Sequence, residues 1–355
     1  MAKPQSDKSQ EAVNEIPANV VDTRIAIDHS ASGGSAAKFT EVPRFGLALG
    51  GGAARGWAHI GVLKLLLREG LRPTVIGGTS IGAVVGGCYA AGKLEELEEF
   101  ARSLTKRRIV SLMDFHLNGS GLLGGDRLQK LLEKHLGMLK IEELPIRFAA
   151  VATELGSGHE IWLTRGPLIE ALRASYALPG VFDAVRVRGR WLMDGALVNP
   201  IPVTTARVLG AETVVAVNLN GDPRARTTIA PSIDPDEGED TITHVNHPSE
   251  KMRRRFFAPF QSGAPSARGK QQARGPGLAT VLMDAFNITQ DRIARSRLAG
   301  DPPDITVSPR LARIGLFDFD RAGEIIDLGE KAAERALPDL IEYFQNQLNS
   351  THQAG

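Results

Sequence analysis

Cysteine is almost absent from this chain: among 355 residues there is one, Cys88. A single cysteine excludes an intrachain disulfide framework and any cysteine-rich metal site, and it favours a cytoplasmic protein. An excess of one charge is also missing, since 42 Lys and Arg stand against 41 Asp and Glu. This balance argues against a dedicated nucleic-acid binder, which usually carries a large basic excess.

Long apolar runs are missing as well. The beginning of the chain is polar and mixed in charge, so we expect neither a signal sequence nor a membrane span there. Ala2 stands where N-myristoylation needs glycine. Membrane contact is therefore expected to be peripheral, on the inner membrane surface. Residues 253–260 join arginines to phenylalanines that could contact such a surface, although a solvated loop is the favoured interpretation. Nothing in the sequence indicates an oligomeric state.

Composition divides the chain into five stretches. Residues 1–43 lack hydrophobic periodicity and are predicted to form a disordered tail. Residues 44–220 alternate short apolar runs with helical patterns and are predicted to form the core that carries the chemistry. Residues 221–277 are rich in proline and glycine, with an acidic and a basic block, and are predicted to be a flexible insertion. Residues 278–346 regain helical patterning and should complete the same domain, and residues 347–355 should form a short tail.

The core shows the alternation of strands and helices that is typical of an α/β domain with a largely parallel sheet. Strands are predicted at 45–49, 74–77, 146–153, 160–164, 191–193 and 213–217, with another at 305–307. Helices are predicted at 54–68, 81–91, 203–209 and 278–298, from a cap at Asp126, from Pro167, and once or twice within 319–346.

A glycine-rich loop follows the first predicted strand. Its residues are Gly50, Gly51, Gly52, Ala53, Ala54, Arg55 and Gly56. Glycines let the backbone present its N–H groups, and the following helix start adds unpaired donors, so the loop suits a phosphate or an oxyanion. A P-loop would need Gly-Lys-Ser/Thr, and Arg55 stands where a Rossmann fingerprint has its third glycine. A nucleotide-binding domain and a tight turn without function are the alternatives.

The second motif is G-x-S-x-G, formed by Gly78, Ser80 and Gly82 between a predicted strand and a predicted helix. In a nucleophile elbow the glycines relieve crowding in the strained turn and hold the serine at a helix N-terminus, where the dipole favours negative charge. The motif also occurs by chance. Its context, with an oxyanion candidate one β-α unit earlier, favours a catalytic serine.

A serine nucleophile needs a base to take its proton. None of the histidines after Ser80 lies at a strand end on a rigid element: these are His116, His135, His159, His244, His247 and His352. A histidine triad is therefore disfavoured. Asp194 ends an apolar strand and is followed by Gly195 and Ala196, so it is the candidate base. An aspartate beside glycine is often only a turn former.

Together the three motifs resemble the patatin-like phospholipase family, and most closely its bacterial branch related to neuropathy target esterase. That family carries a glycine loop with an arginine, a G-x-S-x-G serine and a D-G-A or D-G-G aspartate in this order. The segments 57–63 and 174–182 are similar to the family as well. The resemblance covers about 45–218, resumes more weakly after 278, and implies a three-layer sandwich with a mostly parallel central sheet and a serine elbow.

The resemblance also implies a function. Ser80 would be the nucleophile and Asp194 the proton acceptor of a Ser–Asp dyad that hydrolyses acyl esters of lipids, phospholipids or lysophospholipids, without a metal or other cofactor. The glycine loop, which comprises Gly50, Gly51, Gly52, Ala53, Arg55 and Gly56, would form the oxyanion hole. Its donors are expected to be the N–H groups of Gly51, Gly52 and Ala53, the last standing where many relatives carry another glycine. A non-catalytic lipid-binding regulator on the same fold is the alternative function.

Three further side chains each have two interpretations. Arg55 either orients the loop or contacts an anionic head group, or it binds carbonyls at the helix start. His59 is expected to be a satisfied, partly buried histidine rather than a catalytic one. Cys88 is expected to be a packing residue.

Overall fold

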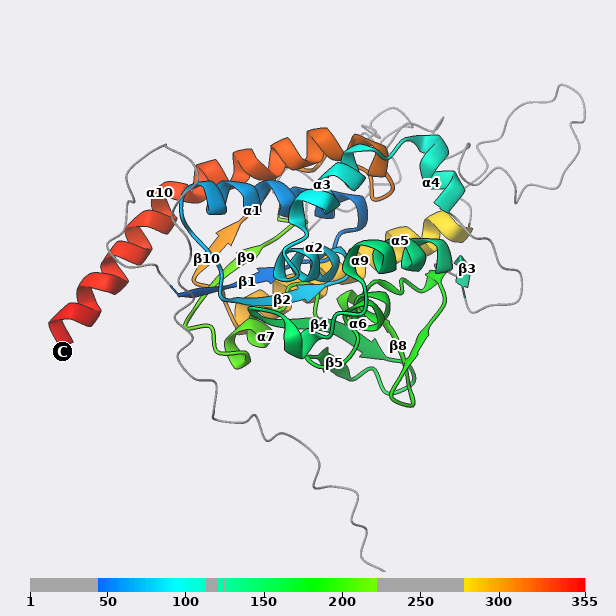
Figure 1. Cartoon of the computed structure of the whole chain (residues 1–355), viewed down its shortest axis with the longest axis horizontal. Coiled ribbons are helices and arrows are strands. Elements are labelled where there is room, and N and C mark those ends of the chain that lie inside the picture. Colours follow the sequence, from blue (N-terminus) through cyan, green and yellow to red (C-terminus); the bar gives the residue numbers. More distant parts are fainter. Residues whose placement is uncertain (1–43, 113–120, 124, 222–277, 355) are drawn as a thin grey trace, which may run out of the picture. The chain divides into compact units, whose positions relative to one another are not determined.

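The computed structural model describes residues 44–112, 121–123, 125–221 and 278–354. Its centre is an eight-stranded sheet of order β10-β9-β1-β2-β4-β8-β7, with β5 also paired to β4 (Figure 1). The five strands from β10 to β4 are parallel, whereas β5 and β8 pair antiparallel with β4, and β7 pairs antiparallel with β8. The strands are β1 (Phe45–Leu49), β2 (Val75–Thr79), β4 (Arg147–Glu154), β5 (Glu160–Leu163), β7 (Val185–Val187), β8 (Arg190–Asp194), β9 (Thr213–Val217) and β10 (Ile305–Val307). A separate two-stranded sheet pairs β3 (Gly121–Leu123) with β6 (Gly180–Phe182).

Helices cover both faces of this sheet (Figure 1). Successive side chains of a strand point to opposite faces. Phe45, Leu47 and Leu49 accordingly join the hydrophobic cluster of α1, α2 and α10, whereas Ala48 joins the cluster of α7 and α9. The predicted three-layer α/β sandwich with a mostly parallel sheet is confirmed. The helices are α1 (Ala58–Arg68), α2 (Ile81–Ala90), α3 (Leu94–Arg102), α4 (Lys106–Leu112), α5 (Asp126–Leu136), α6 (Leu168–Tyr176), α7 (Val203–Val208), α9 (Leu278–Gly300) and α10 (Ala322–Ala354).

Two predicted helix starts differ from the structure. The helix expected from residue 54 begins as a 3-10 turn, Ala53–Trp57, and becomes an α-helix at Ala58. Gly125, in a left-handed conformation, precedes α5, and Asp126 is the first helical residue without a side-chain capping bond. The backbone conformation just before each helix sets the residue at which the α-helix begins. The spacing of apolar residues does not encode that conformation, so the sequence pattern misplaced both starts.

The tail predicted at 347–355 is wrong, because α10 continues to Ala354. Pro338 lies inside this helix without ending it. Beyond the proline, Leu340 and Phe344 are fully buried, and the ring of Phe344 lies 5.2 Å from that of Phe45 in β1. Packing against the sheet therefore holds the helix past the residues where its local pattern weakens.

The predictions for 1–43, 222–277 and the arginine–phenylalanine segment 253–260 lie outside the described residues. Among the helices that the structure describes, none combines the length and the apolar character that crossing a bilayer requires.

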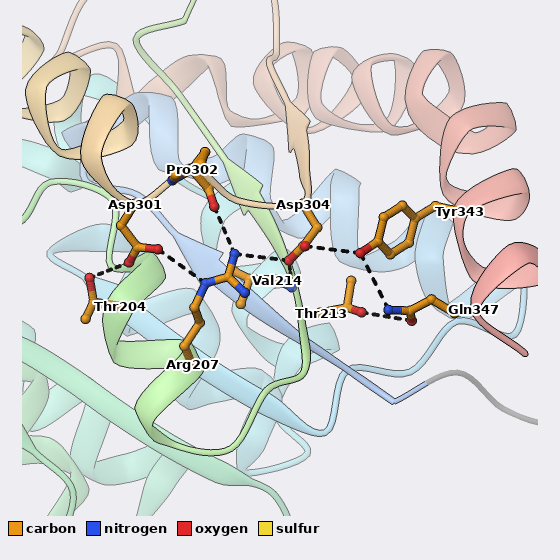
Figure 2. A network of polar contacts seen from close by, with 9 residues as sticks. All are labelled: Thr204, Arg207, Thr213, Val214, Asp301, Pro302, Asp304, Tyr343 and Gln347. Carbon is orange, nitrogen blue, oxygen red and sulfur yellow. Dashed lines mark hydrogen bonds and ion pairs between the residues drawn. The ribbon is translucent and has the colours of Figure 1, made fainter. Parts of the chain in front are cut away.

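A polar network joins α7 and the start of β9 to the residues just before β10 and to α10 (Figure 2). Arg207 of α7 forms ion pairs of 3.3 Å with both Asp301 and Asp304, and it donates to the carbonyl of Pro302 at 2.8 Å. The hydroxyl of Thr204 donates to Asp301 at 2.6 Å. One arginine of the core thus holds two carboxylates of the later segment.

The same network extends to α10. Asp304 accepts the backbone N–H of Val214 at 2.8 Å and the hydroxyl of Tyr343 at 3.1 Å. The hydroxyl of Thr213 donates to Gln347 at 2.9 Å. These contacts fix β10 and the last helix beside β9, at the sheet end opposite the carboxyl ends of the parallel strands.

Arg207→Leu is expected to lower the free energy of unfolding by about 1–3 kcal/mol, because Asp301 and Asp304 lose their shared cation. Thermal unfolding should show a midpoint several degrees lower, with unchanged activity per folded molecule. The exposed Arg310 supplies the control Arg310→Leu. Equal midpoints for the two variants would show that the network does not stabilise the fold.

Candidate active site

Two strands bring Ser80 and Asp194 to one point on the edge of β4. β2 runs parallel to the first part of β4 and ends with Thr79 opposite Val151. β8 runs antiparallel to the last part of β4 and ends with Asp194 opposite Ala152. β5 occupies the other edge of β4 at both positions. The ends of β2 and β8 therefore meet on the same edge, and Ser80, which follows Thr79, lies beside Asp194.

The backbone at Ser80 has the strained geometry of a nucleophile elbow. Ser80 has φ 56° and ψ −125°, a conformation that a residue with a side chain rarely adopts, and it immediately precedes α2. A Cβ on Gly82 would collide with the carbonyl of Leu49 at the end of β1. A Cβ on Gly78 would collide with the backbone of Ala83. Both predicted elbow glycines are thus required by close backbone approach.

Asp194 is a buried carboxylate that receives two hydrogen bonds. The hydroxyl of Ser80 donates to Oδ2 at 2.6 Å, and the backbone N–H of Ala196 donates to Oδ1 at 2.9 Å. Burial raises the pKa of Asp194 from 3.8 to about 7, and these two hydrogen bonds act in the opposite direction. A carboxylate with a pKa near neutrality is matched to the work of a general base.

The hydroxyl of Ser175 holds the elbow from the other side. It accepts the backbone N–H of Ser80 at 2.9 Å and donates to the carbonyl of Val151 at 2.6 Å. Ser175 is fully buried on α6. Sequence reasoning placed this serine in a family-like segment but assigned it no role, since its contact with Ser80 arises only from the packing of α6 against β4.

The glycine loop lies directly against the elbow. A Cβ on Gly51 would stand 3.5 Å from the Cβ of Ser80 and 3.2 Å from the Cβ of Ala196. Ala53 has φ 48°, in the left-handed region that glycine adopts more readily. Ala53, which stands where many relatives carry glycine, therefore occupies a backbone conformation that is strained for a residue with a side chain.

Four N–H groups of this loop, those of Gly50, Gly51, Ala54 and Arg55, donate to backbone carbonyls, and one of them, that of Gly51, was expected to be an oxyanion donor. Gly50 donates to the carbonyl of Val217 at 3.2 Å, and Gly51 donates to the carbonyl of Pro200 at 2.9 Å. Within the described residues, the N–H groups of Gly52 and Ala53 make no such backbone bond. These two remain as candidate oxyanion donors.

His59 holds the glycine loop by a hydrogen bond to the backbone of Gly50. It is fully buried, and its Nε2 donates to the carbonyl of Gly50 at 2.8 Å. Burial lowers the pKa of His59 to about 4, so the ring is neutral at physiological pH. The prediction of a satisfied, partly buried histidine therefore holds only for Nε2, because the ring is completely buried and Nδ1 has no hydrogen-bond partner among the described residues. Of the other described histidines, His135 and His159 are exposed.

Arg55 and Gly56 fix the far end of the loop. Arg55 Nε donates to the carbonyl of Ile314 at 2.9 Å, and Nη1 donates to the side chain of Asn220 at 3.1 Å. A Cβ on Gly56 would collide with the side chain of Ile81. Arg55 thus binds a carbonyl, as one of its two interpretations predicted, and it joins the loop to the segment after β10.

Comparison with known proteins identifies the family. A family model described as patatin-like phospholipase matches residues 47–207. An NTE family protein of Mycobacterium tuberculosis is 34% identical over 329 residues, which cover 83% of this chain and 91% of that protein. The chain belongs to the patatin-like phospholipase family. Proteins of this family are generally lipid acyl hydrolases.

Two more distant similarities agree with this assignment. Patatin-like phospholipase domain-containing protein 6 of Mus musculus is 32% identical over 180 residues, which cover 49% of this chain and 13% of that protein. The crystal structure of VipD from Legionella pneumophila superposes with a TM-score of 0.50 at 14% identity, over 84% of this chain and 67% of that one. At this identity the second similarity concerns the fold alone.

In this patatin domain, Ser80 and Asp194 face an apolar cavity of about 200 Å³. Apart from these two residues its walls are almost entirely apolar, and they include Leu97 and Phe100 from α3 and Leu132 from α5. Such a cavity suits an aliphatic chain. Within the part of the chain that the structure describes, no group of three His, Cys, Asp or Glu side chains is arranged to hold a metal ion.

Cys88 takes no part in the site. It is a buried member of the main hydrophobic cluster, and burial raises the pKa of its thiol to about 12. The prediction that it is a packing residue is confirmed.

Proposed function

We propose that this protein is a serine acyl hydrolase that cleaves carboxylic esters of phospholipids or lysophospholipids through an acyl-enzyme. Ser80 is the nucleophile and Asp194 the base. The observation that carries the proposal is the 2.6 Å hydrogen bond from the Ser80 hydroxyl to a buried carboxylate that, like Ser80, lines an apolar cavity. The family supports the reaction class.

The reaction has two acyl-transfer steps. Asp194 takes the proton of Ser80 while the serine oxygen attacks the ester carbonyl, and the N–H groups of Gly52 and Ala53 stabilise the oxyanion. Collapse of this intermediate expels the alcohol, which receives the proton from Asp194. Water then gives a proton to Asp194 and attacks the acyl-enzyme, and collapse releases the fatty acid and restores the Ser80 hydroxyl.

The shape of the site accounts for the direction in which the substrate binds. The cavity is apolar apart from the dyad, so it holds the acyl chain, while the alcohol part of the ester remains outside it. The backbone N–H of Ser80 is engaged by Ser175. Oxyanion stabilisation therefore depends on the glycine loop rather than on the serine's own N–H.

A fluorophosphonate probe tests the nucleophile directly. We expect covalent labelling of the wild type at Ser80, located by mass spectrometry, and none in Ser80→Ala. The exposed Ser157 in the turn between β4 and β5 supplies the control Ser157→Ala, which should label normally. Labelling that persists in Ser80→Ala contradicts the proposal. Lipid binding with neither labelling nor ester turnover would identify a non-catalytic regulator instead.

A further inference from the structure

A second, smaller hollow lies next to the cavity that Ser80 and Asp194 face. The side chains of Leu97, Phe100 and Leu132 line both spaces. Among the residues that the structure describes, no other side chain lines both, so these three form the partition between the two spaces. We call them the partition.

The partition is built from α3, which packs against α2, and α5, which packs against α6. Leu97 and Phe100 lie one turn apart on α3, and Leu132 lies on α5. Leu97 and Leu132 are buried, whereas Phe100 is partly buried and carries the guanidinium of Arg108 5.5 Å above its ring. None of the three contributes a polar side-chain atom, so none is adapted to bind a head group.

The hollow behind the partition is suited to the end of an aliphatic chain. Leu131, Leu136 and the uncharged thiol of Cys88 contribute to its wall. Lys93 and Glu96 also border it, and they neutralise one another in an ion pair of 2.8 Å. Methylene groups entering from the catalytic cavity would find apolar surface at Leu131, Leu136 and Cys88, and polar side chains only at that pair and at His135.

We propose that Leu97, Phe100 and Leu132 set the longest acyl chain that the enzyme accepts. Replacing a partition residue by a smaller one should then extend the acyl site into the hollow beside Cys88. This inference rests on the proposed hydrolase function. In the wild type, methylenes gain affinity only until the chain reaches the partition. Once the partition is trimmed, each further buried methylene should raise kcat/KM by about fourfold.

A series of p-nitrophenyl esters from butyrate to palmitate tests the proposal. For Leu132→Ala and Leu97→Ala we expect the ratio of kcat/KM for long esters to that for short esters to rise by about tenfold or more, because two or more methylenes gain contacts. Leu132→Phe, which fills the space, should shift the preference towards short esters. The exposed Leu282 of α9 supplies the control Leu282→Ala, which should keep the wild-type profile.

Removing a buried leucine side chain also costs stability, so Leu132→Val is included as a milder change. A folded, active set of partition variants with the wild-type chain-length profile would overturn the inference while leaving the hydrolase function intact. A wild type that cleaves none of these esters and is not labelled at Ser80 would overturn the proposed function, and the inference with it.

Discussion

Asp194→Asn is expected to lower kcat/KM for a lipid ester by about 10⁴-fold, the scale seen when a serine hydrolase loses the carboxylate that supports its nucleophile. Asparagine fits the same space and its oxygen can still accept the N–H of Ala196. Its amide nitrogen would then face the Ser80 hydroxyl and cannot accept a proton. The geometry is preserved while the base is removed. Steady-state kinetics with a short-chain ester measure the effect.

The same substitution is expected to stabilise the protein. Burial raises the pKa of Asp194 from 3.8 to about 7, so the folded protein keeps a proton that the unfolded chain has already released. The free energy of unfolding therefore falls as the pH rises from about 4 to about 7, by a total of about 4 kcal/mol. Asparagine has no proton to lose and avoids this decrease.

Thermal unfolding of both proteins at about pH 5 and about pH 8 separates the two effects. The midpoint of Asp194→Asn should exceed that of the wild type by more at the higher pH than at the lower, since the wild-type carboxylate is then ionised. A difference that is the same at both pH values would show that ionisation of Asp194 is not disfavoured. An inactive but more stable variant identifies a residue that is kept for chemistry rather than for folding.

The sequence was sufficient to single out Ser80 and Asp194, which the structure brings into contact, because short motifs mark both residues. G-x-S-x-G marks a strained turn at Ser80, and an apolar strand ending in Asp194 marks a second strand end. It did not show that the strand before Asp194 runs antiparallel and shares an edge of β4 with β2. That register, which depends on long-range pairing, is what brings the two side chains within 2.6 Å.

The donor set of the glycine loop could not be predicted for a related reason. All its N–H groups look equivalent in the sequence, but Gly51 is engaged by the carbonyl of Pro200, which follows far along the chain. Ser175 and the partition are likewise products of helix packing, and no spacing rule connects them to Ser80. Sequence patterns thus single out the candidate reacting groups, and tertiary packing decides which groups contact them.

His59→Phe is expected to lower kcat by about 100-fold with little change in KM, because the loop beside Ser80 loses its anchor. His59 donates to the Gly50 carbonyl at 2.8 Å from a fully buried position. Phenylalanine fills similar space but leaves that carbonyl without its donor, which favours movement of the loop. Misplacing one oxyanion donor, here the N–H of Gly52 or Ala53, typically costs 100-fold or more in kcat.

His59→Gln separates this effect from a general loss of stability. Its side-chain amide can donate to Gly50 in place of the imidazole, so we expect kcat to recover most of the way towards the wild-type value. The pH profile should be the same in all three proteins near neutrality, since burial keeps the pKa of His59 at about 4 and the ring uncharged there. If the two variants lose stability equally but keep wild-type kcat per folded molecule, His59 only packs. If the pH profile changes, the imidazole takes part in proton transfer and Asp194 is not the sole base.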